Sequence, residues 1–314
     1  MNMQAIILAA GKGSRLQPLT LARSKAMMPV AGKPMLAHVL EILAVTGLSD
    51  IIIVAHPEDS ELHEQFGSIP GVKIVHQAER KGAAHALNCA APFIHGDFIL
   101  SACDNLVDPH EAERFVKNFQ RHSQGQPCGR LALVHMPAEK MTSMGMVLWD
   151  GETISSIVEK PSAERVVSNL ASIPLYCFSR HFLDYLPDIQ PSRRGEYELQ
   201  DGMQMFINDA GELRGELFSG RETVSDARDL LELNLRYLAR EANLPDQHQF
   251  PGVQFNAPCM VEPGAQIESG ARLGPGVLVE RGTTIGAGAH IRRALVLRGA
   301  NIAPGEMIDD QVCA

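Results

Sequence analysis

The sequence predicts an α/β fold with a mostly parallel sheet, followed by a short β-helix. Between residue 1 and about residue 240, short apolar segments alternate with segments of helical periodicity, which is typical of a parallel sheet covered by helices on both faces. Beyond residue 253, large apolar residues recur every six positions, a period typical of a β-helix. A chain of 314 residues is long enough to bury a core in each part.

The predicted elements follow one another in a regular order. The first is a buried strand at Ile6–Leu8, which leads directly into a glycine-rich turn. Apolar residues at helical spacing, β-branched runs and polar helical segments then alternate. These patterns predict helices over Met35–Thr46, Glu58–Phe66 and Ala83–Ala91, and strands over Asp50–Ala55, Lys73–His76, Phe98–Ala102 and Ile154–Val158.

Three candidate site residues come soon after these strands. Gly11 follows the first strand, Gln77 follows the strand that ends at His76, and Asp104 follows the strand that ends at Ala102. In open α/β sheets, ligands bind at the carboxyl ends of the strands. We therefore expect these three residues to converge at one edge of the sheet.

The C-terminal repeat follows a linker rich in Pro, Gln and Asn at Asn243–Gly252. Glycine stands three residues after five of the repeated apolar positions, and about three coils are expected. The spacing predicts a one-residue shift after Leu297, with the repeat continuing at Ile302 and Ile308. The repeated positions are Phe255, Val261, Ile267, Leu273, Val279, Ile285 and Ile291.

Composition narrows the class of protein. The net charge of −9 argues against nucleic acid as a partner, although local cations still allow a nucleotide to bind. The six cysteines lack C-x-x-C pairs and are typical of reduced cytosolic thiols. The N-terminal apolar run is too short for a secretion signal, and we find no apolar run long enough to span a membrane. We therefore expect a cytoplasmic protein without a membrane partner.

The turn after the first strand predicts a triphosphate-binding loop. Glycines allow backbone N–H groups to approach a phosphate, and nearby cations neutralise it. Two common phosphate motifs do not fit, because Leu16 stands where the dinucleotide fingerprint needs a third glycine, and the Gly-Lys-Ser/Thr ending of the Walker loop is absent. The turn reads AAGKGS from Ala9 to Ser14, with Arg15 directly after it and Lys25 further along.

The same segment closely resembles the signature of the sugar-1-phosphate nucleotidylyltransferases. The resemblance covers LAAGKGSRLQPLT from Leu8 to Thr20, together with Lys25, Pro29 and GKP from Gly32 to Pro34. It implies a Rossmann-like nucleotidyltransferase domain over residues 1–242 and a left-handed β-helix over residues 253–314. It also implies that an NTP and a sugar 1-phosphate react to give an NDP-sugar and pyrophosphate. Mg²⁺ is the implied cofactor, since this chemistry needs positioning, charge neutralisation and a metal.

The resemblance also assigns roles to single residues. Arg15 would contact the β- and γ-phosphates, Lys25 would hold phosphate, and Lys160, in the family's Glu-Lys-Pro motif, would bind the sugar phosphate. Asp104 would hold the metal. The nucleotide-binding candidates are Ala9, Ala10, Gly11, Gly13, Ser14, Gln77 and Gly82, and the sugar-binding candidates are Gly145, Glu159 and Asn169.

Several positions depart from the family pattern. Ala26 stands where many relatives have proline, Cys103 where they have glycine, and Ala83 where they have threonine. The largest departure is Thr223, which occupies the place of a second metal-binding aspartate. Three explanations stay open: Asp104, phosphates and water hold the metal, a neighbour such as Glu222 substitutes, or activity is weak.

The pattern leaves alternatives for substrate and function. The order Ala9-Ala10-Gly11, in place of Ala-Gly-Gly, favours UTP as the first choice, with dTTP as the second. An alternative is a non-catalytic, nucleotide-sensing or assembly subunit of such an enzyme. A third reading is a bifunctional acyltransferase that uses His290, against the simpler interpretation of an exposed turn histidine. We expect a homo-oligomer formed through the β-helix, because an open coil end exposes apolar edges.

Overall fold

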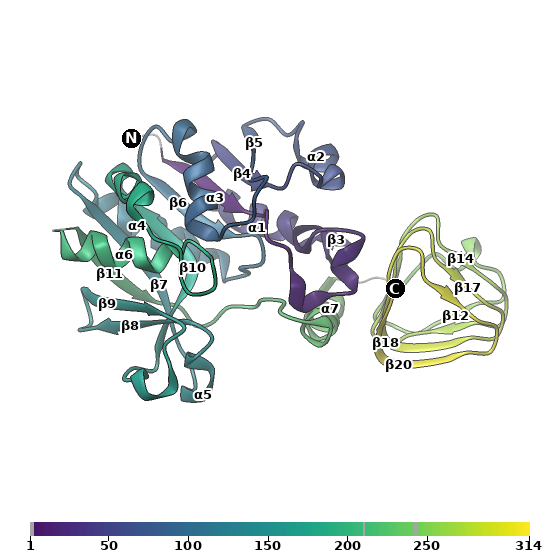
Figure 1. Cartoon of the computed structure of the whole chain (residues 1–314). Coiled ribbons are helices and arrows are strands. Elements are labelled where there is room, and N and C mark those ends of the chain that lie inside the picture. The colour runs from purple at the N-terminus through teal and green to yellow at the C-terminus, as the bar shows by residue number, and fades with distance from the viewer. Residues whose placement is uncertain (1–2, 210, 242–243) are drawn as a thin grey trace. The chain divides into compact units, whose positions relative to one another are not determined.

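The computed structural model describes residues 3–209, 211–241 and 244–314, and these fall into two compact units (Figure 1). The first is built from the described parts of residues 1–12, 24–26 and 36–222, and the second from residues 13–23, 27–35 and 223–314. The second unit therefore groups part of the glycine-rich segment with the C-terminal repeat. The predicted domains, 1–242 and 253–314, stay a prediction, and residues 242 and 243 lie outside the described residues.

The first unit is built around a mixed sheet with the strand order β11-β7-β10-β6-β1-β4-β5. Strand β1 lies parallel to β4 and β6, and β4 lies parallel to β5, as predicted. Strand β10 runs antiparallel to β6, β7 and β8, whereas β11 is parallel to β7. The strands are β1 (Gln4–Leu8), β4 (Ile51–Ala55), β5 (Val72–His76), β6 (Phe98–Ala102), β7 (Cys128–His135), β8 (Gly145–Trp149), β9 (Ile154–Glu159), β10 (Leu170–Phe178) and β11 (Glu212–Leu217).

Local sequence signals explain where the helices of this unit begin. Asp59 caps α2 by accepting a hydrogen bond from the Leu62 N–H at 3.4 Å, so that helix starts later than predicted. Asp108 caps α4 in the same way, with Pro109 in the first helical position. The helices are α1 (Met35–Ala44), α2 (Ser60–Phe66), α3 (Ala83–Ala90), α4 (Pro109–His122), α5 (Ala138–Met141) and α6 (Leu199–Asn208).

The second unit contains a β-helix of short parallel strands (Figure 1). In the first coils, paired residues are 18 positions apart, as in Phe255 with Leu273 and Leu273 with Ile291, so three repeats of the predicted six-residue period make one coil. The apolar side chains of these pairs form a separate buried core. The strands are β12 (Gln254–Phe255), β13 (Cys259–Val261), β14 (Gln266–Ile267), β15 (Arg272–Leu273), β16 (Val277–Val279), β17 (Thr284–Ile285), β18 (His290–Val296), β19 (Asn301–Ile302) and β20 (Met307–Cys313).

The structure confirms the one-residue shift in the repeat, but the predicted position of the shift, after Leu297, is wrong. Val279 pairs with Val296, so the shift lies earlier, between Ile291 and Ala294. The preceding coil turns this corner with three residues, Gly-Pro-Gly at 274–276, whereas this coil uses two, Arg-Arg at 292–293. The shorter corner explains the loss of one residue from the period.

Helix α7 (Ala227–Glu241) and the hairpin of β2 (Pro29–Val30) and β3 (Lys33–Pro34) complete the second unit. Asn234 of α7 is fully buried, accepts a hydrogen bond from the Ala31 N–H at 2.9 Å and donates to the Pro29 carbonyl at 2.8 Å. A single side chain therefore satisfies two backbone groups of the hairpin, one donor and one acceptor.

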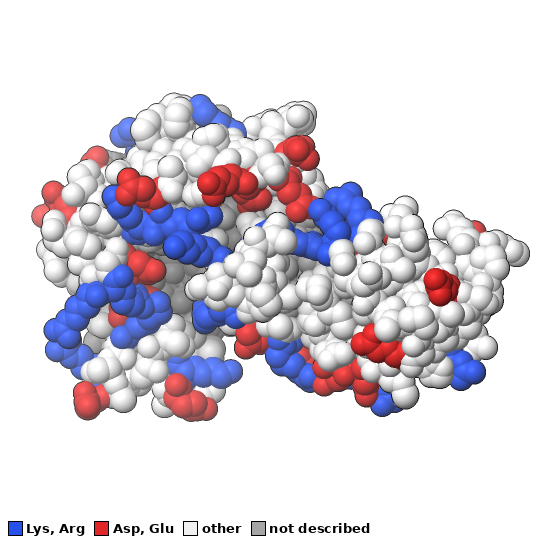
Figure 2. All heavy atoms as spheres, turned by 45° about the vertical axis from the view of Figure 1, so that its right-hand side comes forward, with Lys and Arg blue, Asp and Glu red and all other residues white. Residues whose placement is uncertain are grey.

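The surface carries no single continuous basic face in the view of Figure 2. Lys and Arg gather there in separate patches, with Asp and Glu between them. In the part of the chain that the structure describes, none of the helices combines the length and apolar character needed to cross a membrane.

Candidate active site

The carboxyl ends of the central parallel strands bring the predicted nucleotide-binding segments together. Beyond the strands, the Ala9 N–H donates to the Val54 carbonyl at 2.8 Å, and the Cys103 N–H donates to the Leu8 carbonyl at 3.1 Å. The Gln77 N–H donates in the same way to the carbonyl of Ala55, the last residue of β4, at 2.9 Å. The start of the glycine-rich turn, Gln77 and the residue before Asp104 therefore lie at one edge of the sheet, as the strand order predicts.

Gly11 lies in this turn without a structural need for glycine. Its backbone is outside the left-handed region, and a Cβ placed on it would meet none of the described atoms within 4 Å. The space beside it is therefore open, which suits close approach of a ligand to the backbone. Arg80, which sequence reasoning missed, donates from Nε to the Ala10 carbonyl at 2.8 Å and adds a cation to the turn.

Gln77 and Gly82 form a second part of this edge. Gln77 is 3% exposed, and its Nε2 donates to the Gly82 carbonyl at 3.0 Å and lies 2.9 Å from His85 Nδ1. Gly82 has a φ of +100°, and a Cβ there would lie 2.7 Å from the Tyr197 carbonyl oxygen. Glycine is therefore required at position 82, and the Gln77 side chain is buried rather than solvated.

Lys25 and Asp104 form an ion pair in the first unit. Lys25 Nζ donates to Asp104 Oδ2, and their side chains are 18% and 16% exposed. Burial raises the pKa of the neighbouring Cys103 thiol to about 12, and the charge of Asp104 acts in the same direction. The Cys103 thiol is therefore neutral at physiological pH and is not activated as a nucleophile.

The side chains around Asp104 suit a divalent ion that takes most of its ligands from the phosphates of a bound substrate. Within the described ranges, no group of three or more His, Cys, Asp or Glu side chains forms a complete metal site. Mg²⁺ commonly binds through one or two carboxylates together with water and substrate phosphates, so one aspartate is enough. Asn105, directly after Asp104, is 1% exposed, and its amide makes no hydrogen bond with the described residues. This unsatisfied polar group also suits a polar ligand near Asp104.

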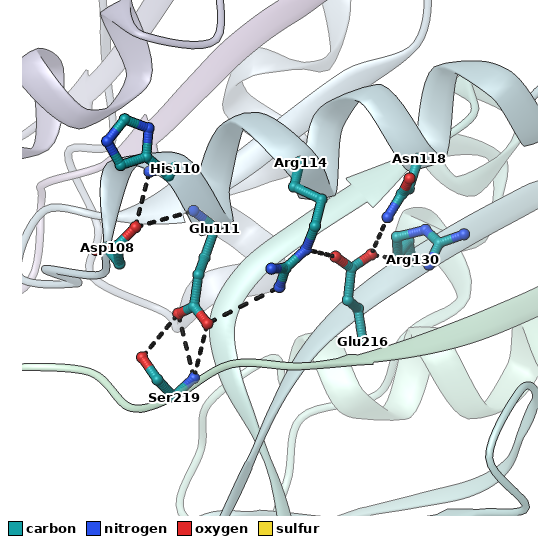
Figure 3. A network of polar contacts seen from close by, with 8 residues as sticks. All are labelled: Asp108, His110, Glu111, Arg114, Asn118, Arg130, Glu216 and Ser219. Carbon is teal, nitrogen blue, oxygen red and sulfur yellow. Dashed lines mark hydrogen bonds and ion pairs between the residues drawn. The ribbon is translucent and has the colours of Figure 1, made fainter.

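The segment that ends at Glu222 is aligned beside Asp104 by backbone pairing. Leu106 and Glu222 exchange two backbone hydrogen bonds of 3.0 and 2.7 Å. Figure 3 shows a polar network that joins α4 to the segment before Glu222. In it, Glu111 of α4 accepts hydrogen bonds from the Ser219 N–H and hydroxyl, and Glu216 of β11 accepts from Arg114, Asn118 and Arg130. Thr223 follows Glu222 directly in the chain.

Two of the three predicted sugar-binding residues, Gly145 and Glu159, meet at the β8–β9 hairpin. Gly145 pairs with Glu159, and a Cβ at Gly145 would lie 2.7 Å from Ser172 Oγ and 3.3 Å from Glu159 Oε2. Lys160 Nζ lies 3.5 Å from Glu159 Oε1, and Arg194 lies 3.9 Å from the same oxygen. Burial raises the pKa of the Glu159 carboxyl, although Lys160 and Arg194 act against the shift.

The remaining predicted residues are more exposed. Asn169 lies just before β10, and its backbone carbonyl accepts a hydrogen bond from the Met136 N–H at 2.8 Å. Gly13 has a φ of +60° and begins the short 3₁₀ turn Ser14–Leu16, which displays an exposed Arg15. His290 is exposed, as its simpler interpretation predicts, but it begins strand β18 and does not lie in a turn.

Comparison with known proteins covers most of the chain. Residues 4–239 match a family model described as nucleotidyl transferase. The chain is 32% identical over 237 residues to the bifunctional protein GlmU of Methanococcus maripaludis, an alignment that spans 75% of this chain and 54% of GlmU. It therefore spans about half the length of that relative. It is also 32% identical to the UTP–glucose-1-phosphate uridylyltransferase AglF of Haloferax volcanii over 65% of this chain and 84% of AglF.

A solved structure resembles the fold. The crystal structure of a UDP-glucose pyrophosphorylase complexed with UDP-glucose has a TM-score of 0.70 and 21% identity, and the match covers 77% of this chain and 100% of that one. At this identity the likeness concerns the fold alone.

Proposed function

The chain belongs to the nucleotidyl transferase family, and we propose that it joins an NTP and a hexose 1-phosphate into an NDP-sugar. An ionised oxygen of the sugar phosphate attacks the α-phosphorus of the NTP and forms a new P–O bond. The bond between the α-phosphorus and the bridging oxygen to the β-phosphorus breaks, and pyrophosphate leaves with the electron pair. The nucleophile is already charged, so the chain has to position the reactants and neutralise charge rather than remove a proton.

One observation carries this proposal: the convergence of nucleotide-binding segments beside the Lys25–Asp104 pair. The glycine-rich turn, Gln77 and Asp104 follow strands whose carboxyl ends lie at one edge of the sheet. Lys25 adds a cation there, and the carboxylate of Asp104 suits a divalent metal. We infer that the metal is Mg²⁺, which would neutralise phosphate charge when it is bound.

The roles of the residues follow from their chemistry. Arg15 has a planar guanidinium that suits two phosphate oxygens, and Lys25 supplies a point charge. Lys160 would bind the sugar phosphate, and the Glu159 carboxylate beside it would accept hydrogen bonds from sugar hydroxyls. Asn169 is the remaining sugar-binding candidate, through its exposed position next to β10.

We propose UTP as the first choice of nucleotide and dTTP as the second. The small Ala9-Ala10 step supports this order, as does the buried amide of Gln77 at the strand edge, a group of the right type to read a pyrimidine. Uracil and thymine differ by one methyl group, a difference that a binding pocket distinguishes only modestly.

The test is a pyrophosphate-release assay with four NTPs, several sugar 1-phosphates and Mg²⁺. The expected result is turnover with UTP or dTTP and one hexose 1-phosphate, abolished by EDTA. Absence of turnover with every pair, together with measurable nucleotide binding, would overturn the enzyme proposal.

That outcome would favour the second candidate, a nucleotide-sensing or assembly subunit. Thr223, where relatives carry a metal-binding aspartate, is the observation that supports it. The presence of Arg15, Asp104 and Lys160 supports the enzyme, because a chain that has lost catalysis has no need to keep all three.

We also propose that the chain self-associates through the β-helix. Within the described part of the chain, β20 pairs with β18 and leaves its other edge open, and Met307 on this strand is 80% exposed. Open strand edges with apolar side chains favour association. Light scattering at micromolar concentration should show an oligomer, and a monomer would reject this proposal.

A further inference from the structure

The loop that carries Arg15 is fixed from within the second unit. Thr20 Oγ1 donates to the Gly13 carbonyl at 2.9 Å and closes the loop on itself. Leu16 anchors it with a side chain only 1% exposed. Arg15 is exposed between these two fixed points. The shape of the loop therefore depends on contacts made by its neighbours rather than by Arg15 itself.

The far end of the loop is held by an ion pair with the β-helix. Arg23 Nη1 donates to Glu280 Oε1 at 2.7 Å, and Arg23 Nη2 donates to Glu280 Oε2 at 2.5 Å. The two side chains are 9% and 4% exposed. The two N–H groups of the guanidinium bind both carboxylate oxygens. The pair therefore fixes the orientation of the Arg23 side chain as well as its distance from Glu280. A buried pair of this kind is strongly disrupted when one partner is removed.

A backbone contact with the next coil of the β-helix holds the Glu280 carboxylate beside Arg23. Its Oε2 also accepts the backbone N–H of Arg298, in the next coil, at 2.9 Å. Glu268 makes the same type of contact elsewhere in the β-helix, because its Oε2 accepts the Ala287 N–H at 2.8 Å. Both glutamates therefore connect one coil to the next, but Glu280 also binds Arg23. This difference provides a matched control.

A second contact holds the next segment of the same signature. Asn234 binds the backbone of Pro29 and Ala31, as described above. In the same hairpin, a Cβ at Gly32 would lie 2.8 Å from Met260 Sδ of β13. The two signature segments that belong to the second unit, 13–23 and 27–35, are therefore held by α7 and the β-helix.

We propose that Arg23 and Glu280 are positioning residues, through which the β-helix sets the shape of the Gly13–Arg23 loop and thereby the orientation of Arg15 on this loop, the residue to which the proposed function gives a phosphate-binding role. The inference rests on the proposed function only for the identity of this ligand. Small displacements of a phosphate-binding group are costly, because the reacting groups must be held in one geometry. The β-helix then contributes to catalysis without a residue of its own in contact with the substrate.

The first test compares Glu280→Gln with Glu268→Gln in the full chain. Both substitutions keep an oxygen that can accept the backbone N–H of the next coil, but only Glu280→Gln removes the charge that holds Arg23. We expect Glu280→Gln to lower kcat/KM for the NTP by about a hundredfold, the effect typical of a displaced positioning group. The KM for the sugar 1-phosphate should stay unchanged, because Glu159 and Lys160 belong to the first unit. Glu268→Gln should leave both constants near those of the natural chain.

The second test measures the loop directly, by hydrogen exchange. The loop contains backbone hydrogen bonds from Leu16 to Gly13 and from Leu21 to Pro18, of 2.9 and 3.0 Å. Their amides should exchange faster in Glu280→Gln and in Arg23→Lys, which keeps the charge but loses the fork, and not in Glu268→Gln. Amides of the β-helix strands should exchange as before.

The outcomes separate this inference from the proposed function. Unchanged exchange in the loop of Glu280→Gln overturns the positioning role, whatever the activity. Faster exchange across the whole second unit, with unchanged KM values, would mean that Glu280 is merely structural, and this also overturns it. If the natural chain turns over none of the substrate pairs, the proposed function fails, and the exchange experiment still decides whether the β-helix shapes the loop.

Discussion

Replacing Gly11 with alanine should affect the stability of the fold and the binding of the NTP in opposite directions. Gly11 is exposed, its backbone is not left-handed, and the described structure leaves 4 Å of free space around a Cβ at this position. Alanine therefore fits without strain and reduces the conformational entropy of the unfolded chain. The free energy of unfolding should stay unchanged or rise by about 0.4–1 kcal/mol.

The effect on the reaction should have the opposite sign. A methyl group at Gly11 would keep a phosphate from the backbone N–H of the turn and remove one hydrogen bond to a charged group, worth about 1.5–3 kcal/mol. This corresponds to a loss of about 10- to 150-fold in kcat/KM for the NTP. Urea unfolding gives the stability, and pyrophosphate release at varied NTP concentration gives the kinetic constant.

Gly47→Ala is the matched control for this substitution. Gly47 also has open space around it, but its φ is +78°, so alanine is strained there by about 1–2 kcal/mol. It follows α1 and has no place in the proposed site. We expect lower stability with an unchanged kcat/KM, the reverse of Gly11→Ala. If Gly11→Ala keeps its full kcat/KM for the NTP, the glycine-rich turn does not contact phosphate and the reasoning is refuted.

Three further predictions concern charged side chains of the site. Asp104→Ala should lower kcat by about a hundredfold or more in a protein that still folds, and a mild effect on kcat would place the metal elsewhere. Its thermal melt should shift to a lower temperature, because Lys25 loses its ion-pair partner. Lys160→Ala should raise the KM for the sugar 1-phosphate, and a change confined to the NTP would contradict its assignment. Because burial raises the pKa of Glu159, the folded chain retains a proton that the unfolded chain loses. Stability should therefore fall as pH rises from the ordinary carboxyl pKa through the raised one. Glu159→Gln should remove this fall in urea unfolding, and an identical pH dependence in both proteins would contradict the shift.

The parallel half of the sheet was predictable because its strands carry local signals. Ile51–Ala55 is a continuous β-branched and apolar run, and such runs are typical of strands buried on both faces. The antiparallel position of β10, between β6 and β7, was not predictable. It depends on pairing between segments that lie far apart in the chain, and the local pattern of Leu170–Phe178 does not specify its partners.

The repeat shows a different limit of sequence reasoning. The period of six was clear, because each coil buries one apolar residue at each repeated position. The place of the shift was ambiguous, because Val296 and Leu297 are adjacent and both are apolar and buried. The two-residue corner at 292–293 resolves the ambiguity, and only the register of the strands reveals it.

In the candidate site, sequence reasoning found residue types but not their partners. Gly82 was predicted from its motif, whereas its physical reason, the close approach of Tyr197, comes from a segment more than 100 positions away. The contact of Arg80 with the turn and the pair of Arg23 with Glu280 likewise depend on tertiary structure. Single surface cations have no local pattern that distinguishes a structural role from a solvated one.

The Lys25–Asp104 pair explains how the proposed site for highly charged reactants stays stable without them. A lone lysine and a lone aspartate, each about four-fifths buried, would both be costly in the free chain, and their pairing offsets that cost. The reactants bring several negative charges, so a second carboxylate beside Asp104 would add repulsion unless a second metal ligand were needed. Since Mg²⁺ takes most of its ligands from phosphates and water, the proposed Mg²⁺ site at Asp104 would not need an aspartate at position 223. Charge balance between protein and substrates, rather than the number of acidic residues, is therefore the property on which the proposed reaction depends.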